Sequence, residues 1–108
     1  TPVNKDDLAA SFQKTISEIL VEKSVNAAKD LGYKTMALAG GVSANTGVRS
    51  LLQQECDKAG IKLFMPALNL CGDNAAMIGC QGYFDFLVGK RADESLNAIA
   101  TLSLEMID

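Results

Sequence analysis

Residues 36–45 read Met-Ala-Leu-Ala-Gly-Gly-Val-Ser-Ala-Asn, which is an apolar run followed by two glycines and short polar residues. After this stretch, apolar side chains recur at steps of three and four, the spacing of an amphipathic helix. They are Val48, Leu51, Leu52, Cys56 and Ala59. The order predicts a buried strand, a tight turn and a helix.

The turn at Gly40 and Gly41 has two interpretations. Because glycine has no Cβ, a ligand can approach the backbone closely, and the helix N-terminus that follows attracts anions such as phosphates. Alternatively, the glycines only make a turn, and Ser43 or Asn45 only caps the helix. The spacing is neither the Gly-x-Gly-x-x-Gly fingerprint nor a P-loop.

The composition is that of an ordinary globular chain of 108 residues, with 48% hydrophobic and 21% charged residues. We therefore expect a single domain, 1–108. The net charge of −3 gives no overall basic field for nucleic acid. With no histidine in the sequence, His-based acid–base catalysis and His-based metal sites within this chain are excluded.

Three further features bear on the cellular location of the protein and on whether the sequence is part of a longer chain. The three cysteines form no Cys-x-x-Cys pair and are odd in number, which favours reduced thiols and a cytoplasmic location. No apolar run approaches the roughly 20 residues that span a membrane. The sequence begins Thr-Pro-Val without methionine, so we expect it to be a piece of a longer protein.

Around the glycine turn we expect two more helices and one more strand. A first helix begins after Asn4 and stops at Gly32, and its apolar face comprises Leu8, Phe12, Ile16, Leu20, Ala27 and Leu31, widened by Val21 and Val25. Strands are expected at 34–38 and 61–65. A last helix, 74–88, is apolar nearly all round and should be buried on several sides. The tail, 93–108, fits a short helix, an edge strand or a packed extended segment.

The predicted order is α-β-α-β-α, and a right-handed crossover makes the two strands parallel. In open α/β sheets, ligands bind beyond the carboxyl ends of the strands. Loops 40–45 and 71–74 both leave from those ends, so the sequence predicts one shared site. Because two parallel strands are few for a stable sheet, we expect neighbouring strands in a longer protein.

Asp73 stands after a loop and near the start of a helix. A carboxylate in that place suits a cation, or the water around a nucleotide-bound cation. An ordinary helix cap is the alternative interpretation.

The blocks Gly-Gly-Val-x-x-Asn (40–45) and Asp-Asn-x-x-Met-Ile (73–78), with Arg49 and Pro66, resemble one family closely. It is the tRNA threonylcarbamoyladenosine synthase family of the TsaD type, formerly called O-sialoglycoprotein endopeptidase or glycoprotease. The resemblance covers nearly the whole chain but only the C-terminal part of the family's length. It implies a C-terminal lobe fragment of the two-lobed actin, Hsp70 and sugar-kinase-like fold. Where the family commonly has threonine, this sequence has Gly72.

The resemblance also implies functional residues. Gly40, Gly41 and Asn45 would contact ATP or the threonylcarbamoyl-adenylate. Asp73 would be one ligand of a divalent metal, iron or zinc, whose other ligands lie in a His-x-x-x-His motif on the absent first lobe. Members of the family transfer the threonylcarbamoyl group to N6 of adenosine 37 in tRNA. The resemblance therefore implies tRNA and partner subunits as partners, and no association with a membrane.

Two other functions remain as alternatives. A metalloendopeptidase needs a His-rich zinc site, which this chain cannot supply. A stand-alone nucleotide-binding or partner-docking module is the second alternative. We expect the isolated chain to be inactive, to hold no cofactor and to form a homodimer.

Overall fold

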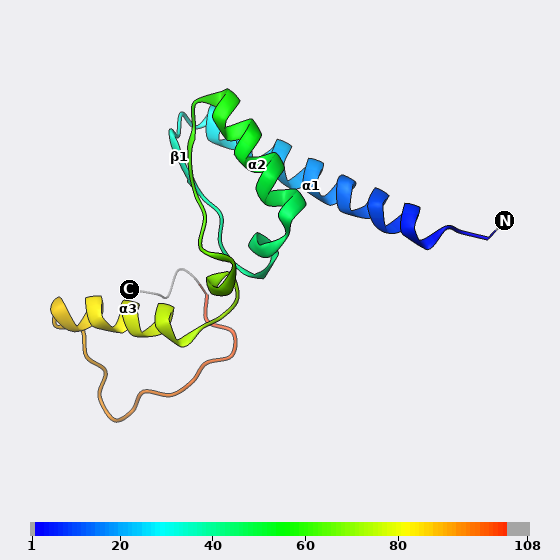
Figure 1. Ribbon diagram of the computed structural model, residues 1–108. Coiled ribbons are helices and arrows are strands. Elements are labelled where there is room, and N and C mark those ends of the chain that lie inside the picture. The colour runs from blue at the N-terminus through cyan, green and yellow to red at the C-terminus, as the bar shows by residue number, and fades with distance from the viewer. Residues whose placement is uncertain (1, 104–108) are drawn as a thin grey trace. The chain divides into compact units, whose positions relative to one another are not determined.

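The computed structural model describes residues 2–103, which fall into two compact units, Thr1–Asn74 and Ala75–Asp108 (Figure 1). The α-β-α-β-α order predicted from the sequence is confirmed, and two 3₁₀ turns that the sequence did not predict are added. In chain order the elements are α1 (Lys5–Asp30), β1 (Thr35–Ala37), η1 (Gly41–Ala44), α2 (Thr46–Ala59), β2 (Lys62–Phe64), η2 (Leu68–Leu70) and α3 (Ala75–Leu87).

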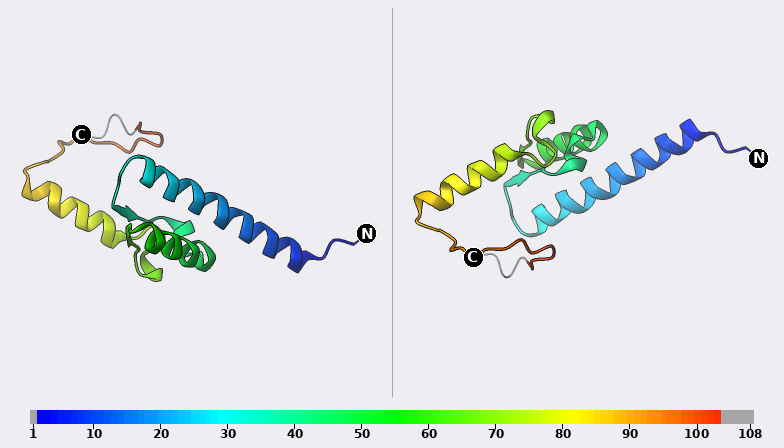
Figure 2. Two further views of the ribbon diagram at one scale, coloured as in Figure 1. Left: turned by 90° about the horizontal axis from the view of Figure 1, so that it is seen from above. Right: turned by 90° about the horizontal axis from the view of Figure 1, so that it is seen from below.

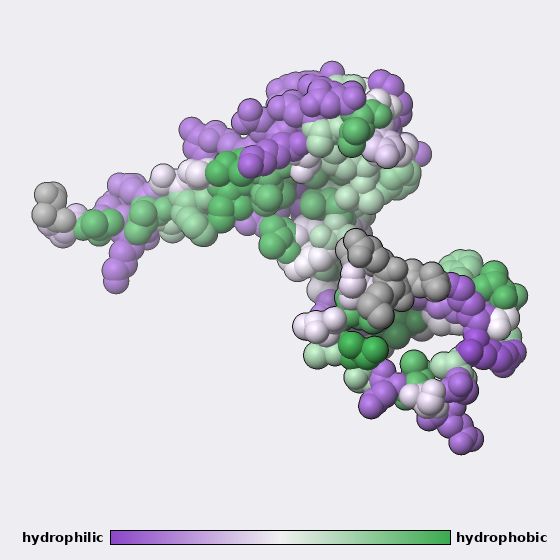
Figure 3. All heavy atoms as spheres, turned by 180° about the vertical axis from the view of Figure 1, so that it is seen from behind, coloured by the Kyte–Doolittle hydropathy of each residue, from purple (hydrophilic) through white to green (hydrophobic). Residues whose placement is uncertain are grey.

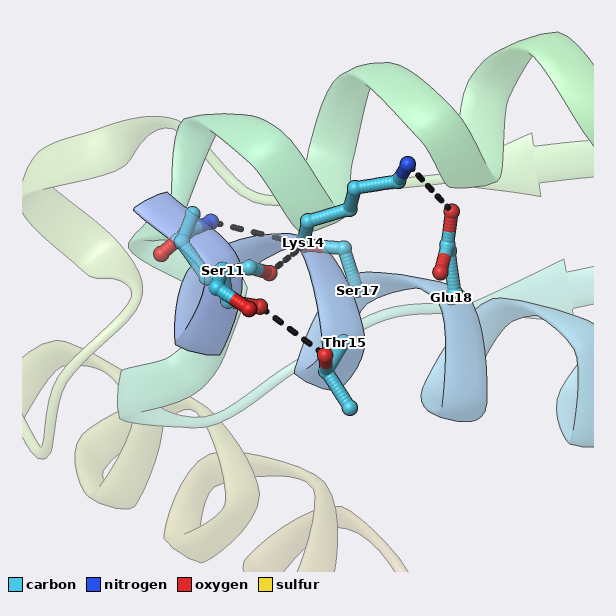
Figure 4. A network of polar contacts seen from close by, with 6 residues as sticks. Ser11, Lys14, Thr15, Ser17 and Glu18 are labelled. Carbon is cyan, nitrogen blue, oxygen red and sulfur yellow. Dashed lines mark hydrogen bonds and ion pairs between the residues drawn. The ribbon is translucent and has the colours of Figure 1, made fainter. Parts of the chain in front are cut away.

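Helix α1 begins and ends where the sequence predicts. The Asn4 side chain accepts a hydrogen bond from the Asp6 N–H at 3.0 Å, which satisfies one free donor of the first turn. At the other end, Gly32 has φ +74°, and the N–H of Tyr33 donates back to the Ala28 carbonyl at 2.8 Å. Exposed polar groups pair along the helix, including Lys14 with Glu18 at 3.8 Å (Figure 4).

The face of α1 that is buried differs from the predicted one. Its buried residues are Ser17, Val21, Val25 and Ala28. Val21 and Val25 belong to the predicted face and are buried, whereas Leu8, Phe12, Leu20, Ala27 and Leu31 are exposed. Phe12 stands nine residues before Val21, about two and a half turns, so it lies on the opposite side of the helix. Phe12 is 66% exposed, and Figure 3 shows apolar side chains gathered along this helix. The predicted face is thus confirmed for Val21 and Val25 and wrong for most of its other residues, because α2 packs on the stripe that contains these two valines.

Helices α1 and α2 lie side by side (Figures 1 and 2) and enclose the core of the first unit. The pattern predicted for α2 is confirmed, since Val48, Leu52 and Cys56 are buried. The central residue of each strand, Met36 in β1 and Leu63 in β2, packs against the core. The core cluster consists of Val21, Val25, Ala28, Leu52, Cys56 and Ile61.

The sheet of the first unit has two strands, and they are parallel as predicted. Met36 pairs with Leu63, and the flanking residues of both strands are exposed. Phe64, for example, is covered only partly by the Lys62 ammonium group, 4.8 Å from the ring centroid. Within the first unit, the helices therefore cover one face of the sheet and no described element covers the other.

Helix α3, in the second unit, carries no buried residue. The prediction that it is buried on several sides is therefore wrong for this chain, and the helix begins at Ala75 rather than Asn74. Of the tail, residues 90–103 form no helix or strand, and 104–108 lie outside the described residues. Among the helices described, none is long and apolar enough to cross a membrane.

Candidate functional site

The glycine loop follows β1 and continues into η1. Gly40 has φ +87°, a conformation that glycine adopts without strain. Its carbonyl accepts the Ser43 N–H at 2.9 Å, and Ser43 is completely buried. A Cβ built on Gly40 or on Gly41 would meet no atom within 4 Å. The surface at both glycines is therefore open to an approaching group.

Asn45 is the N-cap of α2, so the capping interpretation is confirmed for this residue. Its Oδ1 accepts the Val48 N–H at 3.1 Å and the Gln13 Nε2–H at 2.6 Å. Its Nδ2 donates to Gln13 Oε1 at 2.9 Å. Three bonds thus fix the side chain between α1 and α2 and leave one amide hydrogen for any ligand.

The Gln13–Asn45 pair is a part of the site that sequence reasoning missed. Gly47 makes it possible, because a Cβ there would strike Gln13 Nε2 and would stand 3.3 Å from both Asn45 Oδ1 and Ser17 Oγ. A larger residue at this position would therefore displace the end of the Gln13 side chain and disturb its pairing with Asn45. The two amides are 32 residues apart, and no local pattern signals such a pair.

The second loop leaves β2 and reaches Asp73. Cys71 is buried, and its Sγ lies 3.5 Å from the Ala67 carbonyl. Asp73 is exposed, and within residues 2–103 no hydrogen bond or ion pair engages its carboxylate. Because α3 begins at Ala75, the position directly before the helix is Asn74. The carboxylate of Asp73 therefore remains available for a ligand from outside.

Arg49, on the first turn of α2, joins the two loops. Its Nη1 donates to the Ser43 carbonyl at 2.9 Å and lies 3.5 Å from Cys71 Sγ. Its Nη2 donates to the Pro66 carbonyl, directly after β2, at 2.9 Å. The two loops that the sequence predicts to form one shared site are thus physically linked through Arg49. The sequence indicates Arg49 only as part of the family pattern, and its contacts show that it connects the loops.

The described residues of the site could offer one metal ligand, Asp73, but not a complete metal site. Among residues 2–103, no three His, Cys, Asp or Glu side chains lie close enough to hold an ion. All three cysteines are free, as predicted. Burial, and secondarily the Asp57 carboxylate, raise the pKa of the Cys56 thiol, which belongs to the core rather than to the site. Asp73 therefore needs partners from elsewhere to hold a cation.

An apolar hollow of about 270 Å³ lies beside the glycine loop. Its walls suit a flat or apolar group more than a charged one. A second hollow, of about 310 Å³, lies between α1 and α2, and its lining includes Glu18, Glu22, Glu55 and Lys29. The hollow of about 270 Å³ beside the glycine loop is lined by Leu20, Val21, Ser24, Leu38, Val42, Val48 and Leu52.

Two parallel strands backed by helices, with both loops at the carboxyl ends, make Thr1–Asn74 an α/β unit of the kind that binds ligands at strand ends. Residues 2–80 match the family TsaD, tRNA N6-adenosine threonylcarbamoyltransferase. The chain belongs to this family.

Relatives that carry the name tRNA N6-adenosine threonylcarbamoyltransferase span nearly the whole chain. The protein of Clostridioides difficile (strain 630) is 46% identical over 99 residues, which are 92% of this chain and 29% of the relative. That of Listeria innocua serovar 6a is 48% identical over 106 residues, 96% of this chain and 31% of the relative. The chain thus spans about 30% of the length of the curated relatives that it matches.

Proposed function

We propose that this chain is part of a tRNA N6-adenosine threonylcarbamoyltransferase and acts as a single domain, the C-terminal lobe of a two-lobed actin, Hsp70 and sugar-kinase-like fold. The reaction moves a threonylcarbamoyl group from its adenylate to N6 of adenosine 37 in tRNA. The family match over residues 2–80 carries this proposal. The two linked strand-end loops support it, because both leave the same end of the sheet and Arg49 connects them.

In this proposal Gly40 and Gly41 bind ATP or the threonylcarbamoyl-adenylate. The open space over both glycines leaves room for the phosphate, and backbone N–H groups there would stabilise its negative charge. The neighbouring apolar hollow would take the nucleoside. Asn45 would contact the ligand through its remaining amide hydrogen while its other bonds hold the loop against α1.

Asp73 would supply one ligand of a divalent metal, iron or zinc. The exposed, unengaged carboxylate supports this role, and the missing ligands would come from a histidine motif outside this chain. When bound, such an ion polarises a carbonyl group and neutralises a phosphate leaving group. This chain's own contribution is to hold the carboxylate at a fixed place relative to the glycine loop.

The proposed partners are tRNA and the other subunits of a threonylcarbamoyl-transfer complex in the cytoplasm. The overall charge of −3 supplies no electrostatic attraction for tRNA. Most of the tRNA contact should therefore come from the rest of the complex. A stand-alone nucleotide-binding or partner-docking module remains the competing proposal.

The isolated chain is expected neither to transfer threonylcarbamoyl groups nor to cleave glycoproteins. It has no histidine, and it spans about 30% of the relatives' length, so most of the proposed active site is absent. The assay supplies tRNA, ATP, threonine, bicarbonate and the enzyme that makes the adenylate, and it measures modified adenosine by mass spectrometry. A full-length protein containing this chain, with its partner subunits, is the positive control. Transfer or cleavage by the purified chain would contradict the expectation, and an inactive full-length protein would contradict the proposed function.

The isolated chain is expected to self-associate, with a two-fold dimer as the proposed state. Helix α1 has apolar residues on the side away from the core, among them Leu8 and Phe12, and large hydrophobic side chains of α3 are exposed as well. Exposed apolar surface of this kind is unfavourable in water, and unpaired strand edges recruit further strands. Light scattering after size exclusion at low micromolar concentration measures the mass.

A matched pair of variants tests the contribution of α1 to this association. Phe12→Glu and Ser11→Glu add the same charge to neighbouring positions of one helix, the first on the apolar side and the second on a polar side that Figure 4 shows. Phe12→Glu should shift the mass toward the monomer, and Ser11→Glu should leave it unchanged. A stable monomer of the unmodified chain, with cooperative unfolding, would show that the chain covers its own apolar surface.

A further inference from the structure

Arg49 occupies an unfavourable place for a cation. It lies on the first turn of α2, where the N–H groups already give the helix end a partial positive charge. Ion pairs among residues 2–103 do not include it, so no acid compensates this cost. The side chain is only partly exposed. Its contacts with neutral acceptors must account for its position.

Those contacts reach three separate points of the chain. Ser43 belongs to the glycine loop, Pro66 follows β2 directly, and Cys71 stands two residues before Asp73. The guanidinium group is planar and holds its donors in a fixed fork, so two carbonyls bound to its two arms are held at a fixed separation. A lysine ammonium group has no such fork.

No other side-chain hydrogen bond described in residues 2–103 connects residues 40–45 with residues 66–71. The last bond of the sheet at this end runs from the Leu38 N–H to the Phe64 carbonyl at 2.9 Å, before either loop begins. After this bond, the second loop makes hydrogen bonds within itself, such as that from Cys71 Sγ to the Ala67 carbonyl. The distance between the loops therefore depends on Arg49.

We infer that Arg49 is a positioning residue that fixes the glycine loop relative to the loop of Asp73, so that both loops reach one ligand together. This role is a property of the chain itself. Its consequence for threonylcarbamoyl transfer rests on the proposed function, whereas the coupling of the two loops does not.

The three cysteines provide a test that needs no activity assay. Cys71 reports on the linked loops, Cys56 is fully buried in the core, and Cys80 is exposed. On a Cys80→Ser background, Arg49→Met keeps most of the aliphatic stem and removes the fork, and Arg49→Lys keeps the charge. Lys58→Met is the matched control, because it removes a cation from the other end of the same helix. The measurement is the rate of labelling by the uncharged reagent N-ethylmaleimide, with each modified cysteine assigned by peptide mass spectrometry.

Labelling of Cys71 should become about tenfold faster or more in Arg49→Met, the factor that corresponds to the loss of one charge-assisted hydrogen bond. It should remain faster than in the parent in Arg49→Lys and be unchanged in Lys58→Met. Cys56 should stay protected in every variant.

Hydrogen exchange measured on the same variants tests the coupling between the loops. In Arg49→Met, exchange should accelerate together in residues 40–45 and 66–72 and remain unchanged in the core of α1. An unchanged Cys71 rate would overturn the inference. So would a parallel rise at Cys56, since it would show that Arg49 stabilises the whole unit rather than the distance between two loops. Full restoration by Arg49→Lys would overturn the need for the fork.

The consequence for the reaction is tested in a full-length protein that contains this chain. Arg49→Met should lower kcat/KM for transfer and leave the metal content unchanged, because the inferred role of the residue is to hold the two loops at a fixed separation and not to bind the metal. Equal kcat/KM in the variant and the parent would overturn the consequence for transfer. An inactive parent protein would refute the proposed function and leave the labelling result standing.

Discussion

Replacing Asp73 with alanine in a full-length protein that contains this chain is expected to abolish threonylcarbamoyl transfer with almost no loss of stability. The carboxylate is exposed and has no hydrogen bond or ion pair within residues 2–103, so its removal should change the free energy of unfolding by less than about 0.5 kcal/mol. Losing a ligand of a catalytic metal forfeits several kcal/mol of transition-state stabilisation, which is about three orders of magnitude in rate.

Three measurements separate this role from that of an ordinary exposed acid. Transfer is followed by modified adenosine in tRNA, metal content by elemental mass spectrometry, and stability by thermal unfolding. Asp73→Asn, which keeps the shape and removes the charge, should also lose most activity. Asp30→Ala, which removes another exposed carboxylate of the first unit, is the control and should stay active. If metal content and turnover both survive Asp73→Ala, the carboxylate is not a metal ligand.

Local chemistry explains why the elements of this chain could be predicted from its sequence. A capping asparagine opens α1, and a glycine with positive φ ends it. The apolar run, the two glycines and the short polar residues of 36–45 give strand, turn and the start of a helix in order. Each of these signals acts within a few residues. The parallel pairing of the strands followed from the β-α-β order, in which a helix carries the chain back to the start of the sheet.

The choice of the buried face of α1 could not be made from local pattern. This helix has apolar residues on two opposite sides, around Phe12 and around Val25. Which side is buried depends on where α2 lies, and that is fixed by contacts between residues far apart in the sequence. The same reason applies to the Gln13–Asn45 pair, whose enabling feature is a missing Cβ at Gly47.

The candidate site was predictable in part for a related reason. Both loops were placed at one end of the sheet by topology alone, but the link between them is a side chain on the intervening helix. A single arginine at the start of a helix carries no signal of the carbonyls that it will reach. The roles of Gly40, Gly41, Asn45 and Asp73 as ligand contacts remain predictions.

The largest effect on stability is expected from Leu52→Ala, in the centre of the core. Leu52 is 4% exposed and belongs to the cluster that α1, α2 and the sheet enclose. Truncating a buried leucine to alanine costs about 2–5 kcal/mol, because apolar contacts are lost and a cavity remains. A unit the size of Thr1–Asn74 has a total stability of only about 4–11 kcal/mol, so a large fraction would be lost.

Thermal unfolding followed by circular dichroism measures this loss, which should lower Tm by about 10 °C or more in a unit of this size. Leu31→Ala is the matched control, since it makes the same truncation at a leucine that is 71% exposed, and it should shift Tm by only a few degrees. Both variants must be compared at one protein concentration, because self-association would raise the apparent stability. Equal shifts for the two variants would mean that Leu52 is not at the centre of a packed core. The pairing of α1 with α2, on which the positions of both loops depend, would then have to be abandoned.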